Sequence, residues 1–172
     1  PGAVLTRVAA SHIRVGTFQF FAVRKDWAKI KQLADYVIDR HYPETRDADN
    51  PYLALFKAVA EAQAKLVAGW MQIGFIHGVM NTDNLSILGL TIDYGPYGWL
   101  DVYDPDWTPN TTDAEGRRYR YAYQPQIAHW NLVRFAEAIH PLVGETAPLE
   151  EALGSFESTF TGAYRQMMLD KL

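Results

Sequence analysis

Residues 50–74 read "NPYLALFKAVAEAQAKLVAGWMQIG", and this stretch decides the fold class because its apolar positions recur with the period of an α-helix. Asn50 is a typical N-cap residue, Pro51 suits the first helical position, and Gly74 is typical of a helix end. The predicted buried stripe consists of Leu55, Phe56, Val59, Leu66, Val67 and Trp70. We therefore expect a long amphipathic helix that packs against other helices.

A shorter helix is predicted upstream, over residues 26–42. Asp26 is a capping residue immediately before the apolar pattern, and Pro43 cannot continue it. One face of this helix would carry Trp27, Ile30, Leu33, Val37 and Ile38. The same spacing rule thus predicts a second amphipathic helix before the long one.

Two helices are predicted downstream. Residues 124–141 have Pro125 near their start and Pro141 as the expected end, with Ile127, Trp130, Val133 and Ile139 on the buried side. After Pro148 we expect one continuous helix through Leu149, Leu153, Phe156, Phe160, Tyr164 and Met167. The fold class is therefore mainly α, with a small β component (α+β).

Length and composition limit the classes of protein. The chain has 172 residues, of which 48% are hydrophobic, so residues 1–172 are expected to form a single domain. The net charge of -4 provides no global basic field, and we expect no nucleic-acid partner. The chain contains no Cys, which excludes a disulfide, a thiolate nucleophile and a Cys-ligated metal within it.

No segment of the sequence predicts a membrane or a targeting signal. A bilayer span needs roughly 20 consecutive apolar residues, and no run approaches that length. The first residues, "PGAVLTRVAA", lack a basic region followed by a long apolar core. We expect a cytoplasmic protein that does not bind membranes.

The candidate site begins where an apolar run opens onto polar residues. Residues 75–84 read "FIHGVMNTDN", and Asp93 follows nine positions after Asn84. Carboxylate and amide oxygens are the ligands that a hard divalent cation prefers. Residues 85–93, "LSILGLTID", predict two short strands around Gly89. Such a hairpin would bring Asn84 and Asp93 together.

The order of these residues is that of kinase-type phosphoryl transfer, in which one loop supplies a base and an Asn for metal and a later Asp before a glycine supplies a second ligand. Val79 is a departure, because the kinase pattern has its catalytic Asp two residues after the His. Either the chain is catalytically silent, or Asp83 accepts the proton from a different position.

Other polar residues near this loop have simpler interpretations. We expect His77 to organise the loop by bonding to backbone rather than to act as a base or metal ligand. Asn81 and Thr82 are expected to shape the turn. The carboxylates of Asp101, Asp104 and Asp106 could bind metal, but the surrounding prolines favour a role in loop formation.

Two further segments could contact substrates. In "TRVAASHIRVGTFQFF", residues 6–21, Arg7 and Arg14 are seven apart, so on a helix both guanidinium groups would reach one polyphosphate; the alternative is a solvated face. Residues 95–124 predict a long loop, whose "RRYRYAY" stretch could stack bases. Given the acidic chain, an ordered loop or a lip for a protein substrate is favoured.

Four motifs carry a resemblance to a known family. "HGVMNTDN", "GLTIDYGPYGWLD", "YDPDWTPNTTD" and "QPQIAHWNL" closely resemble the SelO (YdiU) family of protein adenylyltransferases, and the match runs from about Leu5 to at least His140. The resemblance implies a protein-kinase-like fold in which ATP binds inverted relative to kinases. It also implies transfer of AMP to hydroxyl side chains of proteins, and of UMP in the presence of manganese.

The resemblance also implies roles for particular residues. Asp83 corresponds to the proton acceptor, Asn84 and Asp93 to the Mg²⁺ or Mn²⁺ ligands, and Arg7 and Arg14 to arginines that contact the phosphates of ATP. Asp93 would also lie beside those phosphates. The alternatives are a pseudokinase scaffold that binds nucleotide or a partner protein without chemistry, and a small-molecule phosphotransferase.

A kinase-like nucleotide site also needs a Gly-rich loop and a Lys paired with a Glu. Six residues precede Arg7, and they contain neither feature. We therefore expect the chain to be the middle portion of a longer protein, chiefly its C-terminal lobe, with a small hairpin that carries the metal-binding loop. Alone, it is expected to turn over little or nothing.

Overall fold

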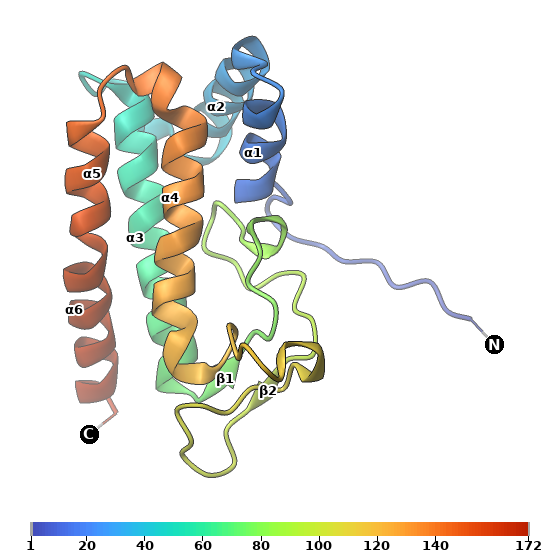
Figure 1. Ribbon diagram of the computed structural model, residues 1–172. Helices are drawn as coiled ribbons and strands as arrows, with labels where there is room; N and C mark the ends of the chain where they lie inside the picture. The colour runs from blue at the N-terminus through green and yellow to red at the C-terminus, as the bar shows by residue number, and fades with distance from the viewer. Residues whose placement is uncertain (1, 172) are drawn as a thin grey trace.

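The computed structural model describes residues 2–171 and is mainly helical, with a small antiparallel sheet of two short strands (Figure 1). Its helices and strands are α1 Val15–Val23, α2 Trp27–His41, α3 Pro51–Gln72, β1 Phe75–Ile76, β2 Gly98–Trp99, α4 Gln124–Val143, α5 Ala147–Gly154 and α6 Phe156–Leu169. Short 3-10 turns are η1 Pro43–Thr45, η2 Thr82–Asn84, η3 Thr111–Asp113 and η4 Tyr121–Tyr123. The prediction of a mainly α chain with a little β structure is confirmed.

The core lies where α1, α3 and α4 meet. Phe18 of α1, Phe56 of α3 and Phe135 of α4 are fully buried. The Phe135 ring lies 5.0 Å from that of Phe18 and 5.8 Å from that of Phe56, centroid to centroid. On the other side of α3, α5 and α6 run along its length (Figure 1). The predicted stripe of α3 is buried except for Leu66, which is half-buried.

The predicted helix starts are confirmed by their caps. A side-chain oxygen of Asp26 accepts a hydrogen bond of 3.2 Å from the Lys29 amide, and that of Asn50 accepts one of 3.1 Å from the Leu53 amide. Pro51 takes the first position of α3, as expected. The Asn50 amide also donates to the Val143 carbonyl at 3.0 Å, which joins the start of α3 to the end of α4.

Two expectations for α4 are wrong. Pro141 lies inside the helix, which ends two residues later with Gly144 in the left-handed region (φ 85°) donating its amide to the His140 carbonyl. A proline at this position removes the hydrogen bond that the Glu137 carbonyl would otherwise accept, but the helix continues for two more residues. Trp130 is 39% exposed, and its ring lies 4.6 Å from the Arg118 guanidinium and 5.4 Å from that of Arg134. The stacked guanidinium groups cover a side chain that was expected in the core.

The last helical segment is also different from the prediction. A single helix was expected after Pro148, whereas α5 and α6 are separated at Ser155. The Ser155 hydroxyl donates to the Ala152 carbonyl at 2.8 Å, and the Ser155 carbonyl accepts from the Thr159 amide at 3.0 Å. A Gly-Ser pair is a common place for a helix to bend or break, and Gly154 precedes Ser155 here.

The predicted hairpin over residues 85–93 does not form. Instead, β1 pairs with β2 with Phe75 opposite Trp99, so the sheet brackets the whole segment between the strands. Residues 85–87 bond to residues 13–15, where α1 begins: the Val15 amide donates to the Leu85 carbonyl at 3.0 Å, and the Ile87 amide donates to the Ile13 carbonyl at 3.2 Å. The apolar side chains of Leu85 and Ile87 are buried, and the backbone partners of these residues lie far away in sequence.

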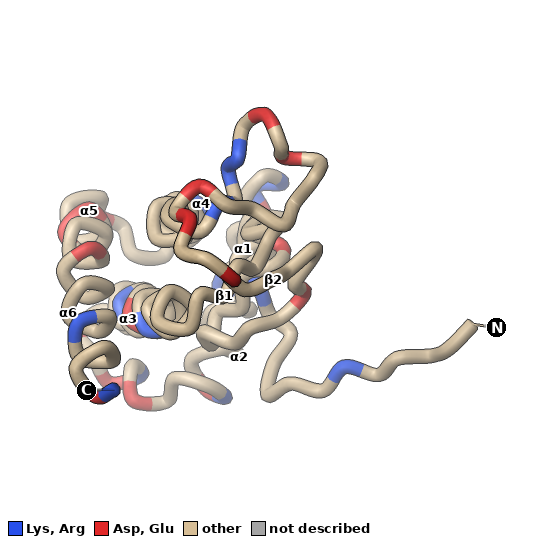
Figure 2. Tube along the Cα trace, turned by 90° about the horizontal axis from the view of Figure 1, so that it is seen from below, with Lys and Arg blue, Asp and Glu red and all other residues tan. Residues whose placement is uncertain are grey.

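The helix that would carry both Arg7 and Arg14 is also absent, because α1 begins at Val15. The preceding residues form an extended segment that leaves the body of the molecule (Figure 1). Acidic and basic positions are interspersed over the elements and the long loop, with no segment of one sign dominating the view (Figure 2). Within the described residues, no helix is long and apolar enough to cross a membrane.

Candidate functional site

Buried side-chain amides hold the segment that follows β1. Gln124, at the start of α4, donates to the Phe75 carbonyl at 2.9 Å and accepts from the His77 amide at 3.0 Å. Seven residues along α4, the Asn131 amide donates to the Met80 carbonyl at 2.9 Å. Both side chains are fully buried. The helix α4 thus satisfies backbone groups of a segment that has almost no regular structure of its own.

Two more amides extend this support. Gln63 of α3 donates to the Ser86 carbonyl at 2.6 Å, and Asn110 of the long loop donates to the Gly78 carbonyl at 2.9 Å. Sequence reasoning missed these residues because it searched for chemistry-bearing side chains. The available signal was a polar residue on the buried face of an otherwise apolar helix, as at Gln63, Gln124 and Asn131.

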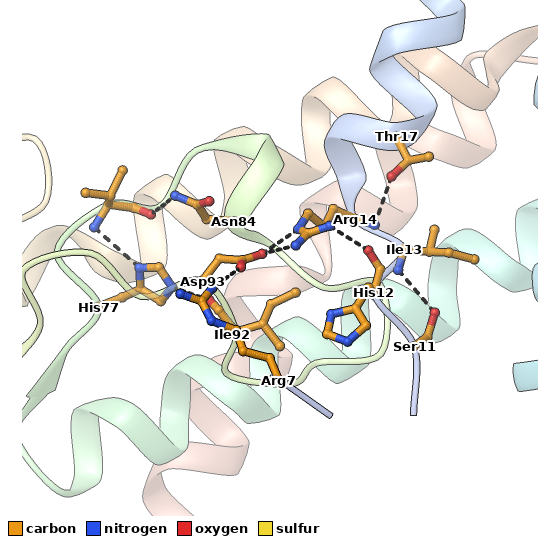
Figure 3. A network of polar contacts seen from close by, with 11 residues as sticks. Arg7, Ser11, His12, Ile13, Arg14, Thr17, His77, Asn84, Ile92 and Asp93 are labelled. Atoms are coloured by element: carbon orange, nitrogen blue, oxygen red, sulfur yellow. Dashed lines mark hydrogen bonds and ion pairs between the residues drawn. The ribbon is translucent and has the colours of Figure 1, made fainter. Parts of the chain in front are cut away.

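His77 connects the segment after β1 with the segment that ends at Asp93 (Figure 3). Its ring is fully buried; Nε2 lies 2.9 Å from the Ile92 carbonyl, and Nδ1 accepts from the Val79 amide at 3.3 Å. Since Nδ1 is an acceptor, Nε2 carries the proton and donates to Ile92. Burial lowers the pKa of His77 below its usual value, which keeps the ring neutral. The prediction that His77 organises the loop through backbone contacts is confirmed.

The turn at residues 81–84 presents Asp83 and Asn84. The Asn84 backbone amide donates to the Asn81 carbonyl at 2.9 Å, and the Thr82 hydroxyl donates to Gln19 Oε1 at 2.7 Å. The Asn84 side-chain nitrogen donates to the Val79 carbonyl at 2.9 Å, which leaves its oxygen available as a ligand atom. Asn81 and Thr82 therefore shape the turn as expected, and Asp83 is exposed.

Asp93 lies between the two predicted arginines (Figure 3). Arg7 Nη1 is 2.8 Å from Asp93 Oδ1, and Arg14 Nε donates to Asp93 Oδ2 at 2.5 Å. The Asp93 side chain is 17% exposed, and that of Arg14 29%. Asp93 also has φ 49°, a conformation that non-glycine residues rarely adopt. The two guanidinium groups converge on Asp93, and an extended segment brings them together rather than a helix.

Arg14 is fixed by its place at the start of α1. It is the N-cap residue, and its backbone amide donates to the Thr17 hydroxyl at 3.2 Å. Its guanidinium also donates to the His12 carbonyl at 2.9 Å. Arg7, by contrast, is 63% exposed and its side chain contacts Asp93 from the extended segment. The two arginines therefore differ in how firmly they are held.

One open hollow of about 700 Å³ collects every predicted site residue. Its lining comprises Arg7, Arg14, Gly16, Thr17, Phe20, Phe21, Asp83, Asn84, Asp93 and Tyr94. The described residues contain no cluster of three or more His, Cys, Asp or Glu side chains that could hold a metal. One or two carboxylates with an amide oxygen suit Mg²⁺, which usually takes its remaining ligands from water and substrate phosphates. The donor set therefore fits Mg²⁺ or Mn²⁺ together with a phosphate-bearing ligand.

The long loop beside the site is ordered, as expected. The Tyr119 hydroxyl donates to Asn81 Oδ1, and the Tyr121 hydroxyl donates to the Met71 carbonyl at 2.5 Å. Two tyrosines of the "RRYRYAY" stretch, Tyr119 and Tyr121, therefore form hydrogen bonds within the chain. Asp104 Oδ1 accepts from the Asp106 amide at 2.9 Å, which agrees with a role in loop formation.

Comparisons with known proteins show the family to which the chain belongs. The family model described as protein adenylyltransferase SelO matches residues 1–172. A protein nucleotidyltransferase YdiU from Flavobacterium johnsoniae is 51% identical over 172 residues, which cover 99% of this chain and 33% of that protein. Its namesake from Xanthomonas oryzae pv. oryzae is 53% identical over 173 residues, which cover 100% of this chain and 33% of the relative.

A third relative of the same name, from Rhodopirellula baltica, is 51% identical over 177 residues, which cover 99% of this chain and 33% of the relative. The chain therefore spans about a third of the length of the curated relatives that it matches. The family model covers the chain from end to end, including all five residues that line the hollow with predicted roles. The chain belongs to the SelO (YdiU) family of protein nucleotidyltransferases.

Proposed function

We propose that the full-length protein transfers AMP from ATP to Ser, Thr or Tyr hydroxyls of other proteins, with Mg²⁺ or Mn²⁺, and that UTP can serve as a second donor. The observation that supports this proposal most is the convergence of Arg7, Arg14, Asp83, Asn84 and Asp93 on one hollow. The family description and the names of the relatives agree with nucleotidyl transfer to protein. We further propose that this region is the C-terminal lobe of a protein-kinase-like fold.

The proposed chemistry begins with the acceptor hydroxyl. Asp83, exposed at the edge of the hollow, accepts the hydroxyl proton as the oxygen attacks the α-phosphorus of ATP. The new oxygen–phosphorus bond forms as the bond between the α-phosphorus and the bridging oxygen breaks, and pyrophosphate leaves. The products are the AMP-modified side chain, pyrophosphate and one proton on Asp83.

The remaining residues hold the nucleotide. Asn84 Oδ1 and the Asp93 carboxylate would hold the metal, which when bound neutralises charge on the phosphates. Arg7 and Arg14 lie against Asp93, and their planar donors suit phosphate oxygens. A metal bound at Asp93 would neutralise the carboxylate charge that now pairs with the two arginines. The guanidinium donors would then be free to bond to the phosphates.

A pseudokinase scaffold remains a second candidate because of Val79. Val79 stands at the position of the kinase base. Its side chain packs closely on Gly95, because a Cβ added to Gly95 would lie only 2.7 Å from Val79 Cγ2. The position is therefore filled by an apolar contact. A scaffold of this kind would bind nucleotide or a partner without transferring anything.

The deciding experiment labels the two ends of ATP separately. The full-length protein is incubated with Mg²⁺ or Mn²⁺, a protein acceptor mixture, and ATP carrying label at either the α- or the γ-phosphate. Label from the α-position on protein supports the proposal. Label from the γ-position on protein or on a small molecule indicates a phosphotransferase instead, and absence of transfer from either position indicates the scaffold.

A further inference from the structure

The first turn of α1 lies directly against Asp83. A Cβ added to Gly16 would lie 2.1 Å from Asp83 Oδ1, 3.0 Å from its backbone nitrogen and 3.1 Å from its Cα. Separations below 3.0 Å essentially do not occur for a real Cβ. Gly16 is buried and belongs to the helix. Alanine forms helices better than glycine, so the helical backbone gives no reason for a glycine here.

The Asp83 carboxylate has no other fixed partner in the described part of the chain. It is exposed, and it takes part in none of the hydrogen bonds or ion pairs found between residues 2 and 171. Its neighbours are held: the Thr82 hydroxyl donates to Gln19 on α1, and Asn84 is bonded to the Val79 carbonyl. What limits the carboxylate on the side of α1 is the bare backbone of Gly16.

We propose that Gly16 is a positioning residue for Asp83, a role that rests on the proposed function of that carboxylate. The missing side chain lets Asp83 lie over the N-terminal turn of α1, whose amide groups favour a negative charge. In that place the carboxylate faces the same hollow as Arg14 and Asp93. Any side chain at position 16 would push the carboxylate away from the acceptor hydroxyl.

The test uses Gly16→Ala in the full-length protein, with Gly162→Ala as its control. Gly162 is also helical, in α6, but nothing lies within 4 Å of an added Cβ there. We expect Gly16→Ala to lower kcat for AMP transfer about 100-fold, because a displacement of about 1 Å can cost that much. The KM for ATP should stay unchanged, and Gly162→Ala should behave as the wild type. Wild-type kcat in Gly16→Ala, or an equal loss in kcat and in ATP affinity, would overturn the proposal.

A second measurement does not depend on activity. Gly16→Ala should lower the melting temperature, and the loss should largely disappear when Asp83→Ala is combined with it, relative to Asp83→Ala alone, because the closest clash is with the carboxylate. An unchanged melting temperature in Gly16→Ala would contradict the close contact. A loss of the same size in both backgrounds would contradict the proposal. This comparison stands even if the wild type transfers no AMP, so a failure of the proposed function is distinguished from a failure of the Gly16 assignment.

Discussion

At the scale of single residues, the clearest contrast is between the two arginines at Asp93. Arg14 is an N-cap residue with three polar contacts to fixed groups, whereas Arg7 reaches Asp93 from an extended, exposed segment. A guanidinium that is already held in place loses less conformational freedom when it binds phosphate. The two residues should therefore contribute unequally to the same task.

Substitution of each arginine by Ala in the full-length protein measures this inequality. A charge-assisted hydrogen bond is worth about 1.5–3 kcal/mol, so Arg14→Ala should lower kcat/KM for ATP about 10- to 100-fold. We expect a smaller loss for Arg7→Ala, and none for Arg165→Ala on the exposed face of α6. Steady-state kinetics of AMP transfer give all three values. A larger loss for Arg7→Ala than for Arg14→Ala would contradict this ranking.

Asp83→Ala should abolish transfer while sparing the fold. A general base typically contributes about 10²- to 10⁴-fold, and Asp83 is an exposed loop residue. Its removal should change the free energy of unfolding by no more than about 0.5 kcal/mol. Transfer of α-labelled phosphate and a thermal melt provide the two readouts. Full transfer by this variant would rule out the assigned role.

His77 should make stability depend on pH. Its pKa in the folded state is lowered by burial, against which the nearby Asp93 charge has a smaller opposite effect, from a usual value of 6.5. Between the lowered pKa of the folded state and the usual pKa of the unfolded chain, the unfolded chain binds more protons than the folded protein. The free energy of unfolding therefore falls as the pH drops below about 6.5, by at most about 1.4 kcal/mol per pH unit. Above that pH the contribution is complete.

The check is a series of thermal or urea unfolding curves from pH 8 down to pH 5.5, a range set to bracket the roughly 6.5 reference value. His77→Gln removes the titrating group and should lack this component of the pH dependence, although it is less stable throughout because it loses buried backbone contacts. An NMR titration that places the His77 pKa above its usual value would contradict the assignment of a neutral, buried ring.

At the scale of elements, α4 acts as the support of the site. Its buried amides replace the hydrogen bonds that a strand or helix would otherwise give to the segment after β1. Gln124→Leu would leave the His77 amide and the Phe75 carbonyl without partners. Each unsatisfied buried group costs about 1–3 kcal/mol, so the loss of both partners should lower the free energy of unfolding by about 2–6 kcal/mol.

Gln126→Leu is the matched control, because Gln126 is exposed two positions further along the same helix. Urea unfolding monitored by circular dichroism should show little change for it. Equal stability of the Gln124 and Gln126 variants would mean that water or a rearranged side chain satisfies the backbone groups, and that α4 does not hold this segment.

Helices could be predicted from sequence where period and caps agreed, as at Asp26, Asn50 and Pro51. Prediction failed where a distant partner decided the local structure. The apolar side chains of Leu85 and Ile87 matched a hairpin strand, but their backbone groups bond to residues at the start of α1. Trp130 matched a core position, but the loop arginine Arg118 covers it from 12 residues away in sequence.

At the scale of the whole molecule, the candidate site combines three separate segments: residues 7–21, which include most of α1, the turn at 81–84, and the loop that begins at Asp93. The family resemblance gave Arg7, Arg14, Asp83, Asn84 and Asp93 as expected members, and the structure brings these five side chains to one hollow. Their geometry could not be predicted, because the convergence of Arg7 and Arg14 depends on an extended backbone and on a left-handed Asp93 rather than on helical spacing.

The chain spans about a third of the length of its relatives, so we compare the expected behaviour of residues 1–172 with that of the full-length protein. We expect residues 1–172 alone to give a cooperative thermal transition, because α1, α3 and α4 share one core. AMP transfer by this piece should be far below that of the full-length protein, since a kinase-like site also needs a Gly-rich loop and a Lys from a second lobe. Equal transfer rates, measured with α-labelled ATP, would show that no second lobe is needed.

The extended segment that carries Arg7 keeps the guanidinium close to the hollow even when it is not bound to Asp93. Arg7 is tethered seven residues from the fixed Arg14, so after each dissociation its guanidinium stays near the hollow at an effective concentration that is of millimolar order for a short flexible linker. Rebinding of Arg7 to Asp93 then competes with its release. Under the proposed function, transfer of Arg7 from Asp93 to a phosphate would need no unfolding of a helix. Arg7 therefore behaves as a tethered ligand of Asp93.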